Sequence, residues 1–413
     1  MPVNISSPPI PEWPDRGLDI EALRGSGWRP SPFDQFVVKI HSRCNLACDY
    51  CYMYELADQS WRNQPKTMSP DVVKVTAKRI ADHARRHDLD SVTIGLHGGE
   101  PLMAGPDRIA SAAQEFRSAM DPGVRLKLGL QTNGALLSER MLNVLLDHDI
   151  GVGVSVDGDR VANDRHRRNS RGDSSYDDVV RGLQLLTTSR YQHLFDGLLT
   201  VIDLRNDPVG TYESLAAFSP PGIDFLLPHA TWAAPPPGRA TSGAGADTSD
   251  TSYGNWLNTA FDHWYGLGKS RIGVRLFRSA IRQLLGRQGA SEQLGTGTLS
   301  FLVIETNGAI EQVDSLKGAF EGAAWTGLHV LRDELDAAFA HPGVVARQIG
   351  IQALSETCQD CRLRDACGGG HYSHRYRSGS GFLNPSVYCG DLMTFLDHVA
   401  ARMRADLATI GKA

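Results

Sequence analysis

The sequence has no apolar run that approaches the roughly 18 residues needed to cross a membrane. Its first 30 residues are rich in proline and charge, and they lack the apolar segment of a secretory signal peptide. We therefore expect a cytoplasmic protein with no membrane partner.

The sequence also lacks an excess of positive charge, because 42 lysines and arginines stand against 47 aspartates and glutamates, for a formal net charge of −5. Phosphate backbones attract basic surfaces, so nucleic acid is not an expected partner. With 41% hydrophobic and 22% charged residues, the 413-residue chain has the composition of a globular protein with a large core. At about 150 residues per domain, this length predicts two or three domains.

Cysteine is scarce. The sequence has seven cysteines, an odd number, and they fall into two groups. The groups are Cys44, Cys48 and Cys51 near the N-terminus and Cys358, Cys361 and Cys367, followed by Cys389, near the C-terminus. In a reducing compartment this distribution is typical of metal ligands rather than of disulfides.

Short β-branched or apolar runs alternate with longer amphipathic stretches over the first half of the chain. The runs predict six strands, at residues 35–40, 91–96, 125–130, 151–156, 197–202 and 222–227. The stretches between them predict crossover helices at residues 70–85, 106–120, 137–148, 174–189 and 208–218. This alternation favours a parallel sheet, and six such units bend into a partial barrel.

The second half of the chain is less regular. Residues 233–252 are rich first in proline and then in small polar residues, which predicts a linker or lid. Two helices are expected at residues 253–267 and 274–285, followed by a hairpin of strands at 299–305 and 309–313. The last cysteines fall in a loop-rich module.

Cys44, Cys48 and Cys51 follow the first predicted strand within a few residues, so their thiolates can converge in one loop. A structural zinc site or a closed cluster takes four protein ligands, and three thiolates therefore leave one iron with an open position. A zinc loop with His41 as the fourth ligand is the alternative.

The spacing Cys44-x3-Cys48-x2-Cys51, with Tyr50 before the last cysteine, resembles the signature of the radical SAM superfamily. The resemblance implies a 4Fe-4S cluster whose open iron binds S-adenosylmethionine (SAM). In that family the reduced cluster cleaves SAM to a 5′-deoxyadenosyl radical.

Further segments match the places where this family binds SAM, and Tyr50 is expected to contribute to the same site. The resemblance implies that Gly98, Gly99 and Glu100 hold the methionine ammonium, with Glu100 supplying negative charge. Ser155 ends the fourth strand, and Arg167 matches an arginine that pairs with the SAM carboxylate in peptide-modifying relatives. Taken singly, the glycines could form an ordinary turn and Arg167 could be a solvated charge.

The second cysteine group provides four thiolates, enough to close a cluster that carries electrons and does not bind SAM. Structural zinc is the alternative for Cys358, Cys361, Cys367 and Cys389. The pattern resembles the SPASM extension of radical SAM peptide maturases, which normally binds two auxiliary clusters.

Two departures from that extension affect the expected number of clusters. The run after Cys367 has His371 where the extension has a cysteine, and residues 294–314 hold none, with Val313 at the expected position. The missing ligands belong to one auxiliary cluster, so we expect two 4Fe-4S clusters in total, one that binds SAM and one auxiliary. His371 is expected to be an ordinary or substrate-facing histidine, with a weak cluster ligand as the alternative.

Asp314 stands where sulfatase-maturating relatives keep a catalytic base. The resemblance implies that this carboxylate removes a proton from the substrate. A turn or cap residue after the hairpin is the alternative.

The resemblance implies an α/β fold, a partial (β/α)6 TIM-like barrel with a C-terminal SPASM-like iron-sulfur module. The expected divisions are an N-terminal leader segment at residues 1–31, the radical SAM barrel at 32–232, a linker and helical bridge at 233–293, the SPASM-like module at 294–398 and a C-terminal helix or tail at 399–413.

Within the SPASM group, six segments resemble the Fxs-type maturases, which form three-residue cyclophanes: residues 36–44, 58–61, 163–168, 225–232, 311–317 and 384–389. The resemblance implies a ribosomal precursor peptide as substrate, loss of a side-chain Cβ hydrogen and a new bond from Cβ to an aromatic carbon. It also implies a flavodoxin or ferredoxin-type electron donor. Formylglycine or thioether formation is the first alternative, and a non-catalytic iron-sulfur carrier or sensor is the second.

Overall fold

The computed structural model describes residues 12–239, 241–242, 245–246, 249–268, 272–289 and 291–410. Parts of the predicted leader, linker and C-terminal tail lie outside these residues. Among the helices described, none has both the length and the apolar character needed to cross a membrane.

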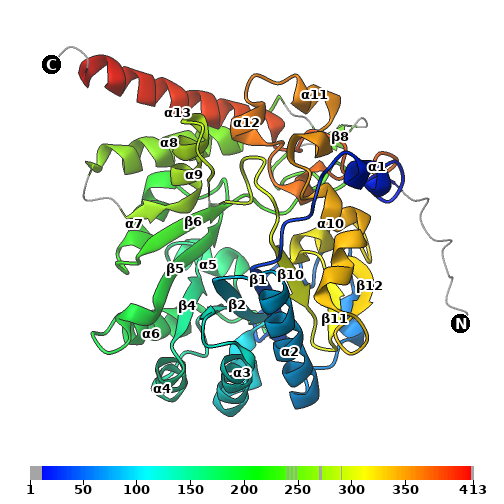
Figure 1. Cartoon of the computed structure of the whole chain (residues 1–413). Helices are drawn as coiled ribbons and strands as arrows, with labels where there is room; N and C mark the ends of the chain where they lie inside the picture. The colour runs from blue at the N-terminus through cyan, green and yellow to red at the C-terminus, as the bar shows by residue number, and fades with distance from the viewer. Residues whose placement is uncertain are drawn as a thin grey trace, which may run out of the picture.

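The centre of the molecule is a ten-stranded sheet in the order β12-β11-β10-β1-β2-β3-β4-β5-β6-β9 (Figure 1). All six predicted strands are present and run parallel to their neighbours in chain order. They are β1 (Gln35–His41), β2 (Ser91–Gly98), β3 (Arg125–Thr132), β4 (Ile150–Ser155), β5 (Phe195–Val201) and β6 (Gly222–Leu226). The predicted α/β fold with a parallel sheet is therefore confirmed.

The predicted crossover helices are also present, and the sequence explains where they begin. Helix α2, for example, begins with Pro70 after Ser69, whose side chain accepts a hydrogen bond from the N–H of Val72. The five are α2 (Pro70–Arg86), α3 (Pro106–Ala119), α4 (Glu139–Asp147), α6 (Tyr176–Leu186) and α7 (Pro208–Ala216). A short helix that the sequence did not predict, α5 (Arg160–His166), follows β4.

The C-terminal half continues the same sheet. Strand β10 (Phe301–Ile304) pairs in parallel with β1, with Val303 beside Val37, and it forms the predicted hairpin with β11 (Ala309–Glu311). Beyond the prediction, β12 (Trp325–His329) adds to β11 and β9 (Gly273–Val274) adds to β6. The segments predicted as a barrel and as a separate module thus share one sheet and one set of backbone hydrogen bonds.

The remaining helices cover the upper part of the view in Figure 1, where α13 lies beside α8. They are α1 (Ile20–Gly25), α8 (Ser252–Gly266), α9 (Arg275–Leu284), α10 (Pro342–Ala346), α11 (Glu356–Gln359), α12 (Arg364–Cys367) and α13 (Cys389–Ile410). Two two-residue strands, β7 (Thr241–Ser242) and β8 (Gly245–Ala246), pair within the predicted linker. Helix α13 begins at Cys389, ten residues before the predicted C-terminal helix at residue 399.

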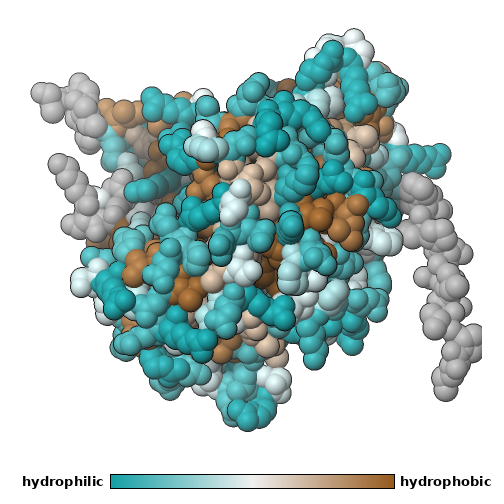
Figure 2. Space-filling model, turned by 60° about the horizontal axis from the view of Figure 1, so that its bottom comes forward, coloured by the Kyte–Doolittle hydropathy of each residue, from teal (hydrophilic) through white to brown (hydrophobic). Residues whose placement is uncertain are grey.

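Apolar side chains of the strands and helices form one large core between the sheet and its helices. Ile94, Leu96, Val152 and Val154 are fully buried there. The surface in Figure 2 is mostly hydrophilic, with hydrophobic groups in small separate areas. Most of the hydrophobic side chains are buried in the core, and the large exposed ones are scattered over many elements.

Candidate active site

The carboxyl ends of the parallel strands surround a cavity of about 370 Å³. This is the place where parallel α/β folds put their chemistry. The cavity is lined by most of the predicted site residues: Cys44, Cys48, Tyr50, Cys51, Gly98, Gly99, Ser155, Arg167 and Asp314. Segments from both halves of the chain therefore contribute to one site.

The three N-terminal cysteines lie in the loop after β1 at one wall of this cavity. The N–H of Leu46 and the Asn133 side chain lie 3.4 and 3.6 Å from the Cys44 sulfur and donate hydrogen bonds to it. Burial raises the pKa of Cys44 to about 12 and that of Cys51 to about 11. A bound cation is what would convert such thiols to thiolates at neutral pH, so this donor set fits an iron-sulfur cluster.

Gly98 and Gly99 hold the end of β2 against the cysteine loop. The N–H of Gly99 donates to the carbonyl of His41 at 2.9 Å, and Gly98 has a φ of 153°. A Cβ on Gly99 would lie 1.7 Å from the Tyr54 hydroxyl and 2.7 Å from the backbone of Arg43. Only glycine fits at this close approach of the two backbones.

If the cysteine loop carries one of the two expected clusters, Gly99→Ala should lose about half of the iron after reconstitution, because the added Cβ displaces the backbone of this loop. Iron and sulfide analysis measures this effect. Gly123→Ala is the matched control, since a Cβ there meets no atom within 4 Å. Equal iron content in both variants would contradict the packing argument.

Glu100 is buried between the ends of β2 and β3. Its side chain is 1% exposed and accepts hydrogen bonds from the N–H groups of Leu102 and Asn133 and from the Thr132 hydroxyl, at 2.7–3.0 Å. A carboxylate engaged in this way fixes the ends of β2 and β3 relative to each other. The role of Glu100 at the SAM ammonium stays a prediction.

Arg167 lies beside Tyr50 of the cysteine loop and fits an anionic ligand. It is 7% exposed, donates to the Tyr50 hydroxyl at 2.9 Å, and its Nε is buried without a hydrogen-bond partner. Burial disfavours its charge, but Tyr50, Cys48 and Asp157 outweigh burial and keep the pKa of Arg167 above its ordinary value. A permanent cation with an unused donor suits the carboxylate of SAM.

Tyr50 and Ser155 are each held by a neighbouring polar group. The Tyr50 hydroxyl donates to Asp157, whose other oxygen accepts from the N–H of Val201 at 3.1 Å. Gln131 donates to the Ser155 hydroxyl at 2.9 Å. These contacts tie the ends of β3, β4 and β5 to the loop that carries the cysteines.

Asp314 begins η5 (Asp314–Gly318) and forms a buried ion pair that the sequence did not predict. The Nζ of Lys39, a 1% exposed residue of β1, lies 2.6 Å from Asp314 Oδ1 and 2.6 Å from Glu305 Oε1. Lys317 in turn contacts Glu305 at 3.0 Å and Glu311 at 2.8 Å. Burial opposes the charge of Lys39, but the carboxylates outweigh it and raise its pKa, so this network orients Asp314 at the cavity wall.

The four C-terminal cysteines lie near one another, in or beside helices α11, α12 and α13. Cys358 lies in α11, Cys361 follows it, Cys367 ends α12 and Cys389 begins α13. Burial and the nearby Cys358 and Cys361 raise the pKa of Cys389 to about 11, and burial raises that of Cys367 to about 12. Four neighbouring thiols, one buried and three half-buried, fit a closed cluster.

Val313 and His371 stand at positions where the SPASM pattern has cysteines. Val313 is 2% exposed and packs in an apolar cluster with Leu316, Tyr372 and Phe382. His371 lines the cavity beside His229 and His374.

Sequence reasoning missed Lys39, His229 and His374. A signal existed for Lys39, because a lysine inside the run Phe-Val-Val-Lys-Ile is unusual for a strand buried on both faces. No comparable signal marked His229 and His374, which lie far apart in the sequence.

The fold and this cavity are similar to those of radical SAM enzymes. Residues 38–207, which include the cysteine loop and β2 to β5, match the model of the Radical SAM superfamily. Enzymes of this class use SAM and a 4Fe-4S cluster.

The chain is also similar along most of its length to particular members of this class. It is 24% identical over 390 residues to the serine-type anaerobic sulfatase-maturating enzyme of Bacteroides thetaiotaomicron, covering 90% of both proteins. It is 23% identical over 376 residues to the cysteine-type enzyme of Clostridium perfringens, covering 90% of this chain and 97% of the relative. The structure of native anSMEcpe with bound AdoMet and Cp18Cys peptide has a TM-score of 0.75 at 20% identity, covering 91% and 99%, which shows a shared fold.

Proposed function

We propose that this radical SAM enzyme oxidises a side chain of a peptide or protein substrate at Cβ. The observation that carries the proposal is the position of Asp314 in the same cavity as Cys44, Cys48 and Cys51. A substrate in this cavity would have the radical source on one side and a carboxylate on the other. Oxidation of a C–H bond needs both, because a hydrogen atom, an electron and a proton have to leave.

When bound, the SAM cluster supplies the radical that takes the hydrogen atom. The residues of the chain perform the other tasks. Asp314, oriented by Lys39, would accept the proton, and Arg167 would hold the SAM carboxylate. Cys358, Cys361, Cys367 and Cys389 would hold one auxiliary cluster that accepts the surplus electron, while a flavodoxin or ferredoxin-type protein would supply the first electron.

Formylglycine formation on a serine or cysteine is the outcome that the relatives support. Both sulfatase-maturating enzymes align with about nine-tenths of this chain. This favours the alternative drawn from the sequence over the cyclophane crosslink that the sequence first suggested. For serine, loss of the Cβ hydrogen atom, one electron and the hydroxyl proton gives the aldehyde.

Crosslinking to an aromatic ring is the second candidate, and one observation favours it. Val313 packs in an apolar cluster where the SPASM pattern places a cluster ligand. The chain therefore departs from the ligand set usual in sulfatase maturases. In a crosslink the surplus proton comes from the aromatic ring after the new C–C bond forms.

Mass spectrometry of two peptides distinguishes these outcomes. The reconstituted enzyme, SAM and a reductant are incubated without oxygen with a sulfatase peptide containing serine, and separately with the precursor peptide encoded beside the gene. We expect one peptide to lose two hydrogens. An aldehyde that reacts with a hydrazide identifies formylglycine, whereas an unreactive product that resists fragmentation over an aromatic-x-x triplet identifies the crosslink.

Omission of SAM is the control for each incubation. Release of 5′-deoxyadenosine with neither peptide changed would contradict both outcomes for these substrates. Absence of 5′-deoxyadenosine with a fully reconstituted enzyme would contradict the radical reaction itself.

A further inference from the structure

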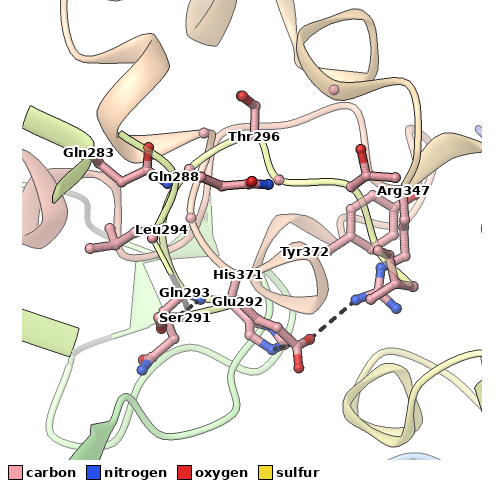
Figure 3. A pocket seen from close by; sticks show the side chains of 18 of the residues that line it. Gln283, Gln288, Ser291, Glu292, Gln293, Leu294, Thr296, Arg347, His371 and Tyr372 are labelled. Atoms are coloured by element: carbon pink, nitrogen blue, oxygen red, sulfur yellow. Dashed lines mark hydrogen bonds and ion pairs between the residues drawn. The ribbon is translucent and has the colours of Figure 1, made fainter. Parts of the chain in front are cut away.

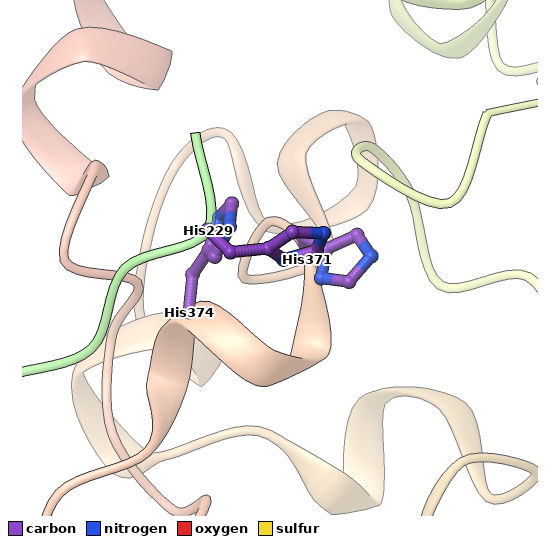
Figure 4. A group of neighbouring side chains, drawn as sticks. All are labelled: His229, His371 and His374. Atoms are coloured by element: carbon purple, nitrogen blue, oxygen red, sulfur yellow. The ribbon is translucent and has the colours of Figure 1, made fainter. Parts of the chain in front are cut away.

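Three histidines that the proposed reaction does not use gather at one wall of the active-site cavity (Figure 4). His229 lies in the loop after β6, and His371 and His374 lie at the start of and within η8 (Tyr372–Arg375). A ring nitrogen of each lies within 4.8 Å of those of the other two. The ring centroids are 4.9–5.8 Å apart.

The hydrogen bonding of these rings is incomplete. His374 is 2% exposed, yet neither of its ring nitrogens has a hydrogen-bond partner, and His229 Nδ1 is also buried without one. Buried polar atoms in proteins are normally bonded, so these nitrogens indicate a ligand that the protein chain does not itself supply.

His371 is oriented by groups around it. Its Nδ1 lies 2.9 Å from the Ser373 hydroxyl, which leaves Nε2 as the atom directed at a ligand. Glu292 Oε2 lies 4.0 Å from that Nε2 and 3.4 Å from Arg347, as Figure 3 shows. Metal-binding histidines are typically held in this way through the second ring nitrogen.

The three rings are uncharged at neutral pH. Burial lowers the pKa of His229 to about 4, and it lowers those of His371 and His374 well below the ordinary value. Neutral imidazole is the form that binds metal ions. Three imidazoles without a thiolate suit Zn²⁺, Fe²⁺ or a similar ion, whereas iron-sulfur clusters are held mainly by cysteines.

We propose that His229, His371 and His374 bind one divalent first-row transition-metal ion, with a further coordination position open to the active-site cavity. Three protein ligands leave one position of a tetrahedral ion for water or a substrate atom. Ligand nitrogens on such an ion are about 3.4 Å apart, so the rings reach this geometry by small rotations. The ion would lie near the cysteine loop, since the His229 ring packs at 4.7 Å on Tyr52, the neighbour of Cys51.

Zinc binding to the holoenzyme tests the site, with Zn²⁺ itself as the probe. Protein with both clusters reconstituted is titrated with Zn²⁺ against a chromophoric chelator, and zinc, iron and sulfide are measured. We expect one zinc per chain, bound roughly 100-fold or more weakly in His374→Ala and His229→Gln, with iron unchanged. His193→Ala, which replaces an exposed histidine of η3 (Gln192–Leu194), is the matched control and keeps wild-type zinc affinity.

X-ray absorption at the zinc edge tests the unmodified protein and does not depend on how the variants fold. We expect nitrogen ligands at about 2.0–2.1 Å with the scattering pattern of imidazole, rather than sulfur at about 2.3 Å. Sulfur ligands, zinc retained in the histidine variants, or no zinc bound to the holoenzyme would each overturn the proposal. These readouts are independent of the reaction proposed above, which is judged by its products.

Discussion

Replacing Cys48 by serine is expected to reduce 5′-deoxyadenosine formation to the level of protein without clusters. Cys44, Cys48 and Cys51 are the only cysteines of the sequence near the cavity end of β1, so no other thiolate of that loop can replace a lost ligand. A serine hydroxyl stays protonated at neutral pH and binds iron poorly. Liquid chromatography of the nucleoside product measures the effect.

Cys358→Ser is the matched control for this experiment. It removes a thiolate from the other group, so both variants are expected to lose about half of the iron. SAM cleavage should persist in Cys358→Ser and vanish in Cys48→Ser. If Cys48→Ser still releases 5′-deoxyadenosine at the wild-type rate, the assignment of the N-terminal loop to the SAM cluster is wrong.

Replacing Asp314 by asparagine is expected to separate SAM cleavage from product formation. Asparagine keeps the shape of the side chain but cannot take a proton, and general bases typically contribute about 10²-fold or more to a rate. The yield of modified peptide per 5′-deoxyadenosine should therefore fall roughly 100-fold. The two products are measured in the same anaerobic reaction.

Glu311→Gln shows whether that effect belongs to the carboxylate in the cavity or to the buried charge network. Glu311 pairs with Lys317, as Asp314 pairs with Lys39, but Glu311 does not line the cavity. We expect Glu311→Gln to keep the wild-type ratio of products, with any loss limited to stability. An equal loss of coupling in both variants would remove Asp314 from the role of base.

Much of the fold could be predicted because it depends on local patterns. All six barrel strands follow apolar runs bounded by turn residues, and five crossover helices begin near cap residues such as Ser69 and Asp207. The cysteine loop could also be recognised, since its three cysteines lie within eight residues and their spacing is itself the signal.

Other features depend on contacts between distant segments and gave no local signal. The pairing of β10 with β1 brings Asp314 to Lys39, which joins residues on opposite halves of the chain. Glu100 lies within a motif, yet its direction is decided by donors from Thr132 and Asn133 on the next strand. A sequence pattern shows which side chains are present, but it does not show which distant residues they contact in the folded protein.

The linear order of the residues thus determined the strands, the helices and the two thiolate groups, because propensity, capping and ligand spacing act over a few residues. The tertiary structure alone decided which side chains share the cavity. Folding brings together residues that are far apart in the sequence. It buries Lys39 against two carboxylates and places His229 beside His371 and His374. Such groups meet only when the core has formed, because apolar burial brings the distant segments together and water is excluded from between them.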